Sequence, residues 1–159
     1  MGKALLKVQV AVLALGVVFS WFTLVVDYRR FFAAGGHVFE LSGCAVANPL
    51  MTPCFYGALA FLAAFIWAVA VLRSAPEVMT QRQRGLNWLL AAGTVFAWGN
   101  FAYEVVRFAQ PHPTPSAFSC PKDEALVHPL MTPCFYGAMI YLTALVVSML
   151  ILRSHTARA

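Results

Sequence analysis

The sequence predicts an all-α integral membrane protein: a four-transmembrane-helix bundle made of two tandem helix-loop-helix repeats, with a pseudo-twofold axis along the membrane normal. Three observations predict this fold class. The 159 residues are 61% hydrophobic and 11% charged, whereas about a quarter of the residues in a soluble domain are charged. The chain also contains four long uncharged runs, and one ten-residue string occurs in it twice. We therefore expect a single membrane domain over residues 1–159.

The four uncharged runs are the predicted membrane-spanning helices. They cover residues 8–26, 54–72, 86–103 and 134–152, and each approaches the roughly 20 residues that cross a bilayer as a helix. Hydrocarbon offers no hydrogen-bond partner to an irregular backbone, so helices are expected. The first run resembles the apolar part of a cleaved secretory signal, but it is longer than such a segment and belongs to the repeat. We therefore expect it to be retained.

The repeated string, Pro-Leu-Met-Thr-Pro-Cys-Phe-Tyr-Gly-Ala, occupies residues 49–58 and 129–138. The runs that precede the two copies also match at a constant offset: Leu13, Gly16, Phe19, Trp21 and Asp27 correspond to Leu90, Gly93, Phe96, Trp98 and Glu104. We place repeat one at 4–74, a cytoplasmic linker at 75–85 and repeat two at 86–154. Because each repeat crosses the membrane twice, both have the same orientation, and the axis between them follows the membrane normal.

In each copy of the string, the threonine is predicted to cap the following helix, and the next proline to occupy its first position. These residues are Thr52, Pro53, Thr132 and Pro133. The glycine of each copy begins a stripe of small residues, and such stripes let membrane helices approach closely. The two stripes are Gly57, Ala64, Ala68 and Gly137, Ala144, Ser148. The string thus predicts helix starts and helix packing, and no catalytic residue is assigned.

The distribution of charge predicts the orientation. Seven of the eleven lysines and arginines fall on the side of the two termini: Lys3, Lys7, Arg73, Arg82, Arg84, Arg153 and Arg158. Positive residues in short loops favour the cytoplasmic side. We therefore expect cytoplasmic termini and outer cysteine-bearing loops, in a bacterial plasma (inner) membrane. This topology and the lipid surface explain the net charge of +5, and no basic stripe with interleaved aromatics indicates a nucleic acid partner.

All four cysteines fall in the predicted outer segments. Cysteines on the oxidising side of a membrane favour disulfides, and four of them allow three connectivities. The simplest pairing that treats both repeats alike is Cys44–Cys54 and Cys120–Cys134. Each bond would join a loop to the start of the helix that follows it.

The helix number, orientation and cysteine placement resemble the disulfide-generating membrane oxidoreductases of the DsbB and vitamin K epoxide reductase type. The resemblance implies transfer of electrons from outer cysteine pairs to a quinone. Those families carry a Cys-x-x-Cys pair, whereas the cysteines of each segment here are farther apart, and a close pair is what favours rapid exchange. Soft sulfur ligands for a cuprous ion are a further interpretation of Met51, Cys54, Met131 and Cys134, with His128 nearby. We assign no metal site.

A polar stripe runs along the first and third predicted helices. Its members toward the outer surface are Thr23, Asp27 and Arg30 in the first helix, and Asn100, Glu104 and Arg107 in the third. Steps of three and four residues keep each set on one helical face. One interpretation is a packed seam with ion pairs at the water interface. The other is a polar pocket open to the outer side, because ionisable groups near a membrane interior are functional candidates.

Three functions follow as hypotheses. The first is a non-enzymatic accessory or assembly subunit, or a binding component, with outer loops fixed by disulfides. The second is the thiol–quinone oxidoreductase, the one case in which a cofactor, quinone, is expected. The third is a transporter or channel for a small solute or ion, which would use the charged residues of the polar stripe. The expected partners are the lipid bilayer and either other membrane-protein subunits or further copies of the chain.

Overall fold

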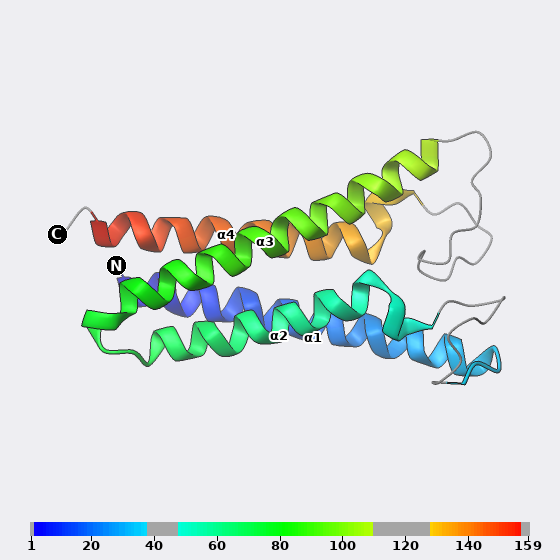
Figure 1. Ribbon diagram of the computed structural model, residues 1–159, viewed down its shortest axis with the longest axis horizontal. Coiled ribbons are helices and arrows are strands. Elements are labelled where there is room, and N and C mark those ends of the chain that lie inside the picture. Colours follow the sequence, from blue (N-terminus) through cyan, green and yellow to red (C-terminus); the bar gives the residue numbers. More distant parts are fainter. Residues whose placement is uncertain (1, 38–47, 110–127, 157–159) are drawn as a thin grey trace.

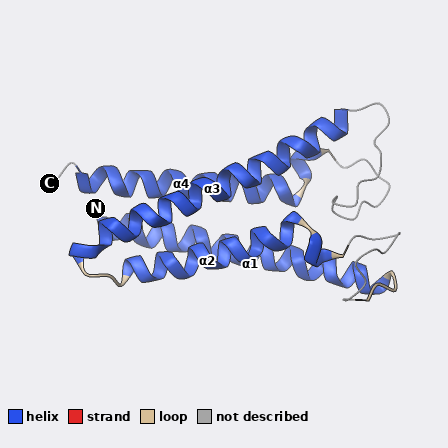
Figure 2. Ribbon diagram, in the orientation of Figure 1, coloured by secondary structure: helices blue, strands red, loops and turns tan. Residues whose placement is uncertain are grey.

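The computed structural model describes residues 2–37, 48–109 and 128–156. Every regular element within these ranges is helical, and Figure 2 shows no strand among them. In chain order the elements are α1 (Gly2–Ala33), the 3₁₀ helix η1 (Pro49–Met51), α2 (Pro53–Leu72), α3 (Pro76–Ala109), the 3₁₀ helix η2 (Pro129–Met131) and α4 (Pro133–Thr156).

The four α-helices of these described ranges are long and apolar enough to cross a membrane, as the sequence predicts. The mean hydropathy of their most apolar windows is 2.2 in α1, 2.3 in α2, 1.2 in α3 and 2.1 in α4. The third helix begins at Pro76, well before the uncharged run from which it was predicted. Proline suits the first helical position, and the acid of Glu77 stabilises a first turn. Residues 77–85 are therefore helical, and the connection to α2 is a short turn.

The helices form an antiparallel bundle in which neighbours along the chain are neighbours in space (Figure 1). The pairs α1–α2, α2–α3, α3–α4 and α1–α4 pack directly against one another. Both termini and the α2–α3 turn lie at one end, which we call the terminal end. The 3₁₀ helices lie at the opposite end, which we call the η end. Short connections between antiparallel helices are typical of such bundles.

The small-residue stripes are confirmed in part. Ala64, Ala68, Ala144 and Ser148 are almost completely buried in the bundle. Their first members behave differently, because a Cβ atom added at the glycine of either string, Gly57 or Gly137, would meet no atom within 4 Å. The prediction that these glycines permit close helix approach is therefore wrong.

Gly16 of α1 and Gly93 of α3 make the close contacts instead. A Cβ atom added at Gly16 would lie 2.5 Å from the ring of Phe61, and one at Gly93 would lie 2.5 Å from the ring of Tyr141. The two helices can pack directly on these rings only because both positions are glycine.

The starts of α2 and α4 follow the predicted order, with a threonine before a proline. Thr52 is the N-cap residue of α2 and Pro53 follows it, but the threonine hydroxyl does not cap the helix. It donates instead to the carbonyl oxygen of Pro49 at 2.7 Å, within η1. The predicted side-chain cap is therefore wrong at Thr52, because its hydroxyl is turned back to the preceding 3₁₀ turn.

Candidate functional site

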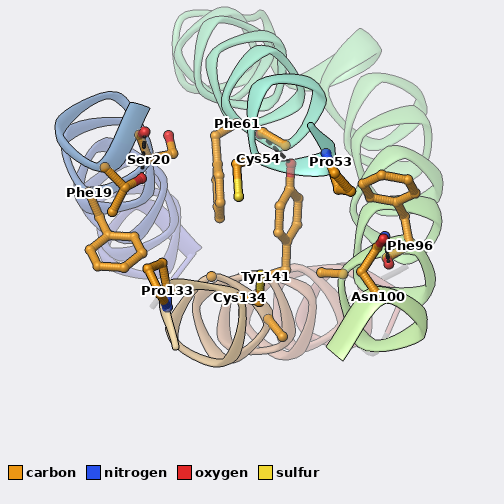
Figure 3. Close-up of a pocket in the computed structure, with 15 residues that line it drawn as sticks. Phe19, Ser20, Pro53, Cys54, Phe61, Phe96, Asn100, Pro133, Cys134 and Tyr141 are labelled. Atoms are coloured by element: carbon orange, nitrogen blue, oxygen red, sulfur yellow. Dashed lines mark hydrogen bonds between the residues drawn. The ribbon is translucent and has the colours of Figure 1, made fainter. Parts of the chain in front are cut away.

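A cavity of about 70 Å³ lies between the four helices toward the η end. It could hold several water-sized groups, since one water needs roughly 10–15 Å³ of such volume. All four α-helices line it: Phe19, Ser20 and Thr23 from α1; Pro53, Cys54, Gly57 and Phe61 from α2; Phe96, Ala97 and Asn100 from α3; Pro133, Cys134, Gly137, Ala138 and Tyr141 from α4. Figure 3 shows these side chains around one space between the helices.

Two stacked aromatic rings form part of the cavity wall. The centroids of Phe61 and Tyr141 are 3.9 Å apart and their planes meet at 27°. The stack bridges α2 and α4 across the bundle, while Gly16 and Gly93 hold it from the other two helices. The Tyr141 hydroxyl donates to the carbonyl oxygen of Gly57 at 3.4 Å. Rings fixed from four sides give the cavity a rigid wall.

The two hydroxyls of the cavity donate within their own helices, and the Asn100 amide uses one of its two N–H groups in the same way. The Ser20 hydroxyl donates to the carbonyl oxygen of Val17 at 3.1 Å, and the Thr23 hydroxyl donates to that of Ser20 at 2.8 Å. The Asn100 amide nitrogen donates to the carbonyl oxygen of Phe96 at 2.8 Å. Lone pairs of the two hydroxyl oxygens and the Asn100 amide oxygen therefore remain to accept hydrogen bonds. The lining is mainly apolar, and the polar groups that remain are these acceptors and the second N–H of Asn100.

Two of the four cysteines line this cavity. Cys54 and Cys134 occupy the same position in the two copies of the string, and both are half-buried. They are not joined to each other by a disulfide. Their predicted partners, Cys44 and Cys120, lie outside the described residues. The two predicted disulfides therefore stay predictions.

The six residues of the predicted polar pocket separate into two groups. Thr23 and Asn100 line the cavity, whereas the four charged residues are not among its lining side chains. Those four are Asp27, Arg30, Glu104 and Arg107. Arg30 is exposed and Asp27 and Glu104 are half-buried, while the guanidinium of the buried Arg107 lies 5.9 Å from the ring centroid of Tyr103. The cavity is thus an aromatic space with a few acceptors, and the charges lie outside its lining.

Several lining residues did not stand out in the sequence as candidates for a site. Phe19 and Phe96 correspond at the offset of the first helices, and Phe61 and Tyr141 correspond at the offset of the strings. Aromatic residues at matching positions of both halves were a usable signal. In an apolar run, however, an aromatic residue facing a cavity cannot be told from one facing lipid.

No protein-family model matches the chain, and no curated protein and no solved structure is detectably similar to it.

Proposed function

We propose that this chain is a non-enzymatic membrane protein that acts as a binding component, and that the cavity near its η end receives a small, largely apolar ligand or group. The observation that carries the proposal is the cavity itself, into which all four helices direct side chains. Concave, mainly apolar sites with a few polar groups are typical of ligand binding, and such sites often lie between the helices of bundles.

The proposal includes a topology. The η end faces the outside of a bacterial plasma membrane, both termini are cytoplasmic, and the pseudo-twofold axis between the repeats passes through the cavity along the membrane normal. The corresponding cavity residues of the two halves support the axis: Phe19 and Phe96, Thr23 and Asn100, Cys54 and Cys134, Gly57 and Gly137, Phe61 and Tyr141. The outer loops carry the disulfides Cys44–Cys54 and Cys120–Cys134. A ligand would then enter from the outer side or from the outer leaflet.

The volume and lining of the cavity limit the ligand. An engineered apolar cavity of about 150 Å³ holds a benzene ring, so about 70 Å³ accommodates a smaller group. A short hydrocarbon group of a ligand that carries one hydrogen-bond donor fits both the aromatic wall and the amide oxygen of Asn100. A ligand with a net negative charge does not fit, because the lining is mainly apolar and contains no cationic side chain.

Native mass spectrometry of the protein, released from its own membrane in mild detergent, tests the proposal. We expect a bound small molecule or a specific lipid on the wild type, and its loss from Gly137→Leu, which fills the cavity. Gly99→Leu is the matched control, because a Cβ atom at Gly99 also meets nothing within 4 Å, while Gly99 does not line the cavity. Equal ligand retention in both variants, or no ligand on the wild type, would overturn the proposal.

A thiol–quinone oxidoreductase is the second candidate, because Cys54 and Cys134 share the cavity with four aromatic rings. In that reaction a dithiol becomes a disulfide, and its two electrons and two protons reduce the quinone to a quinol. A quinone ring is larger than the space described above, so the bundle would have to open for it. A ubiquinone reduction assay with dithiothreitol as the reductant distinguishes the two functions. Activity lost in Cys54→Ser and Cys134→Ser would favour the enzyme, and its absence in wild type would exclude it.

The accessory-subunit version of the proposal concerns the outside of the bundle. The most apolar segment of α3 has a lower mean hydropathy than those of the other three helices. Only 11% of that segment is buried in the bundle, against 28–33% for the others. A less apolar helix is poorly suited to face lipid alone. We therefore propose that α3 contacts another membrane-protein subunit or a second copy of the chain.

A further inference from the structure

Three polar side chains meet in the core on the terminal side of the cavity. The Gln83 amide nitrogen donates to the amide oxygen of Gln9 and to the hydroxyl oxygen of Ser148, both at 3.0 Å. The three residues come from α3, α1 and α4, and none is more than 1% exposed. Along α1 and α3, the fully buried Leu13 and Leu90 lie between this cluster and the cavity. The polar cluster is therefore separate from the proposed ligand site.

The cluster leaves polar atoms without a partner. The Gln9 amide nitrogen and the Gln83 amide oxygen are buried and make no hydrogen bond. Asn87, one turn after Gln83 on the same face of α3, adds a buried amide oxygen that also makes none. A donor and two acceptors thus lie unpaired inside a membrane bundle, out of reach of bulk solvent and with no partner among lipid chains.

The positions that correspond to these three residues at the offsets of the internal sequence match are apolar. Gln9, Gln83 and Ser148 correspond to Leu86, Leu6 and Ala68. All three counterparts are buried members of the hydrophobic core. The chain therefore already contains an apolar solution for this packing, and the polar cluster is a specific departure from it.

We propose that the cluster of Gln9, Gln83 and Ser148 is an internal water-binding site. The water accepts from the Gln9 amide nitrogen and donates to the Gln83 amide oxygen, and its second hydrogen is directed toward Asn87. Buried waters typically make about three hydrogen bonds to otherwise unsatisfied groups, which is the number offered here. The water lies among α1, α3 and α4, on the terminal side of Leu13 and Leu90, and does not contact the cavity.

Water-to-protein magnetisation transfer in NMR tests this site on the full chain in lipid nanodiscs, with ¹⁵N-labelled glutamine side chains. Gln9→Met and Gln83→Met variants assign the two signals. Exposed Gln81 is the positive control, and the backbone amides of buried Leu13 and Leu90 are the negative controls. We expect transfer from water to the side-chain amides of Gln9 and Gln83, as to Gln81 but not to the leucines. In Gln83→Met, the transfer to Gln9 should fall, because the bridging water loses its main acceptor.

Transfer to Gln81 alone would overturn the proposal. That result would mean that the two glutamine amides pair reciprocally, with Gln9 donating directly to Gln83, and that the core is dry. The readout does not involve the cavity. The experiment can therefore exclude the water site without affecting the proposed ligand site. Loss of the ligand site in the mass spectrometry experiment would likewise leave the water site intact.

Discussion

At the scale of single residues, four glycines of the spanning helices have two different roles. Gly16 and Gly93 admit the rings of Phe61 and Tyr141, whereas the glycine of each string, Gly57 or Gly137, borders open space in the cavity. The same residue type thus allows tight packing at one level of the bundle and leaves volume at another. Substitution by alanine separates these roles.

We predict that Gly16→Ala and Gly93→Ala destabilise the bundle, while Gly57→Ala does not. Overpacking of a core costs about 1–3 kcal/mol, and the stacked rings cannot easily move away from a new Cβ atom. At Gly57, where there is space, alanine gains up to about 1 kcal/mol in helix propensity. Thermal unfolding in mild detergent should rank Gly57→Ala at or above wild type and the other two below it. Equal midpoints for all three variants would contradict the packing described here.

The cavity should also accept xenon, which binds in small apolar cavities. The methyl group of Ala138, a buried residue of the lining, reports on it through its NMR signal. Under xenon pressure we expect this signal to shift in wild type and in Gly99→Leu. It should not shift in Gly137→Leu, whose side chain occupies the space. An unresponsive Ala138 signal in wild type would mean that the cavity is closed.

The sequence anticipated part of this site. Thr23 and Asn100 were found because polar residues are conspicuous in apolar runs, and both line the cavity. The ring pair Phe61 and Tyr141 was not found, because hydrophobicity does not distinguish a side chain facing a cavity from one facing lipid. The role of the string glycines was misjudged for a related reason: a small residue permits either contact or empty space, and the packing of the other helices decides which.

At the scale of elements, the short 3₁₀ helices determine how α2 and α4 begin. The Asn48 side chain accepts from the backbone nitrogen of Leu50 at 3.1 Å, and His128 accepts from that of Leu130 at 3.4 Å. Each 3₁₀ helix therefore has its own capping side chain, and the threonine after η1 is free to bond the carbonyl oxygen of Pro49. The sequence pattern predicted the starts of α2 and α4 correctly, but it could not reveal that the Thr52 hydroxyl bonds to the turn before the helix.

We expect Thr52→Val to lower stability and Thr52→Ser to keep most of it. Valine has the same shape but removes the hydroxyl donor, so the Pro49 carbonyl keeps only the backbone N–H of Thr52, at a cost of about 0.5–1.5 kcal/mol. Serine retains the donor. Chemical unfolding in detergent, followed by far-UV circular dichroism, measures both variants. If serine and valine were equally destabilising, the methyl packing of Thr52 and not its hydrogen bond would be the stabilising contact.

At the scale of the whole molecule, the polarity of the core does not follow the internal sequence match. The polar cluster of Gln9, Gln83 and Ser148 takes residues from both halves of the chain, and the positions that correspond to them at the same offsets are apolar. Buried polar groups often cost stability compared with apolar residues of similar volume, while removal of a single partner is strongly destabilising. The chain therefore supplies its own apolar replacement for a direct comparison.

Gln83→Leu alone should destabilise the bundle, because Gln9 and Ser148 lose their donor, at about 1–3 kcal/mol. The triple variant Gln9→Leu, Gln83→Leu, Ser148→Ala copies the apolar counterpart set and should recover wild-type stability or exceed it. Such non-additivity is expected for residues of one hydrogen-bonded network. Thermal unfolding in detergent measures both proteins. A triple variant that is less stable than the single one would show that the two halves of the core are not interchangeable.

The weak burial of α3 leads to a last prediction about assembly. Its exposed face presents Ala92 and Ala102, and small residues of this kind let another membrane helix approach closely. In mild detergent we expect wild type to migrate as a complex larger than one chain, and Ala92→Phe to shift it to the monomer. Ala63→Phe, at an exposed position of α2, is the control and should leave the complex intact. The mass of the complex distinguishes a second copy from a different subunit, while a wild type that migrates only as a monomer would leave lipid as the covering of α3 and exclude the subunit role.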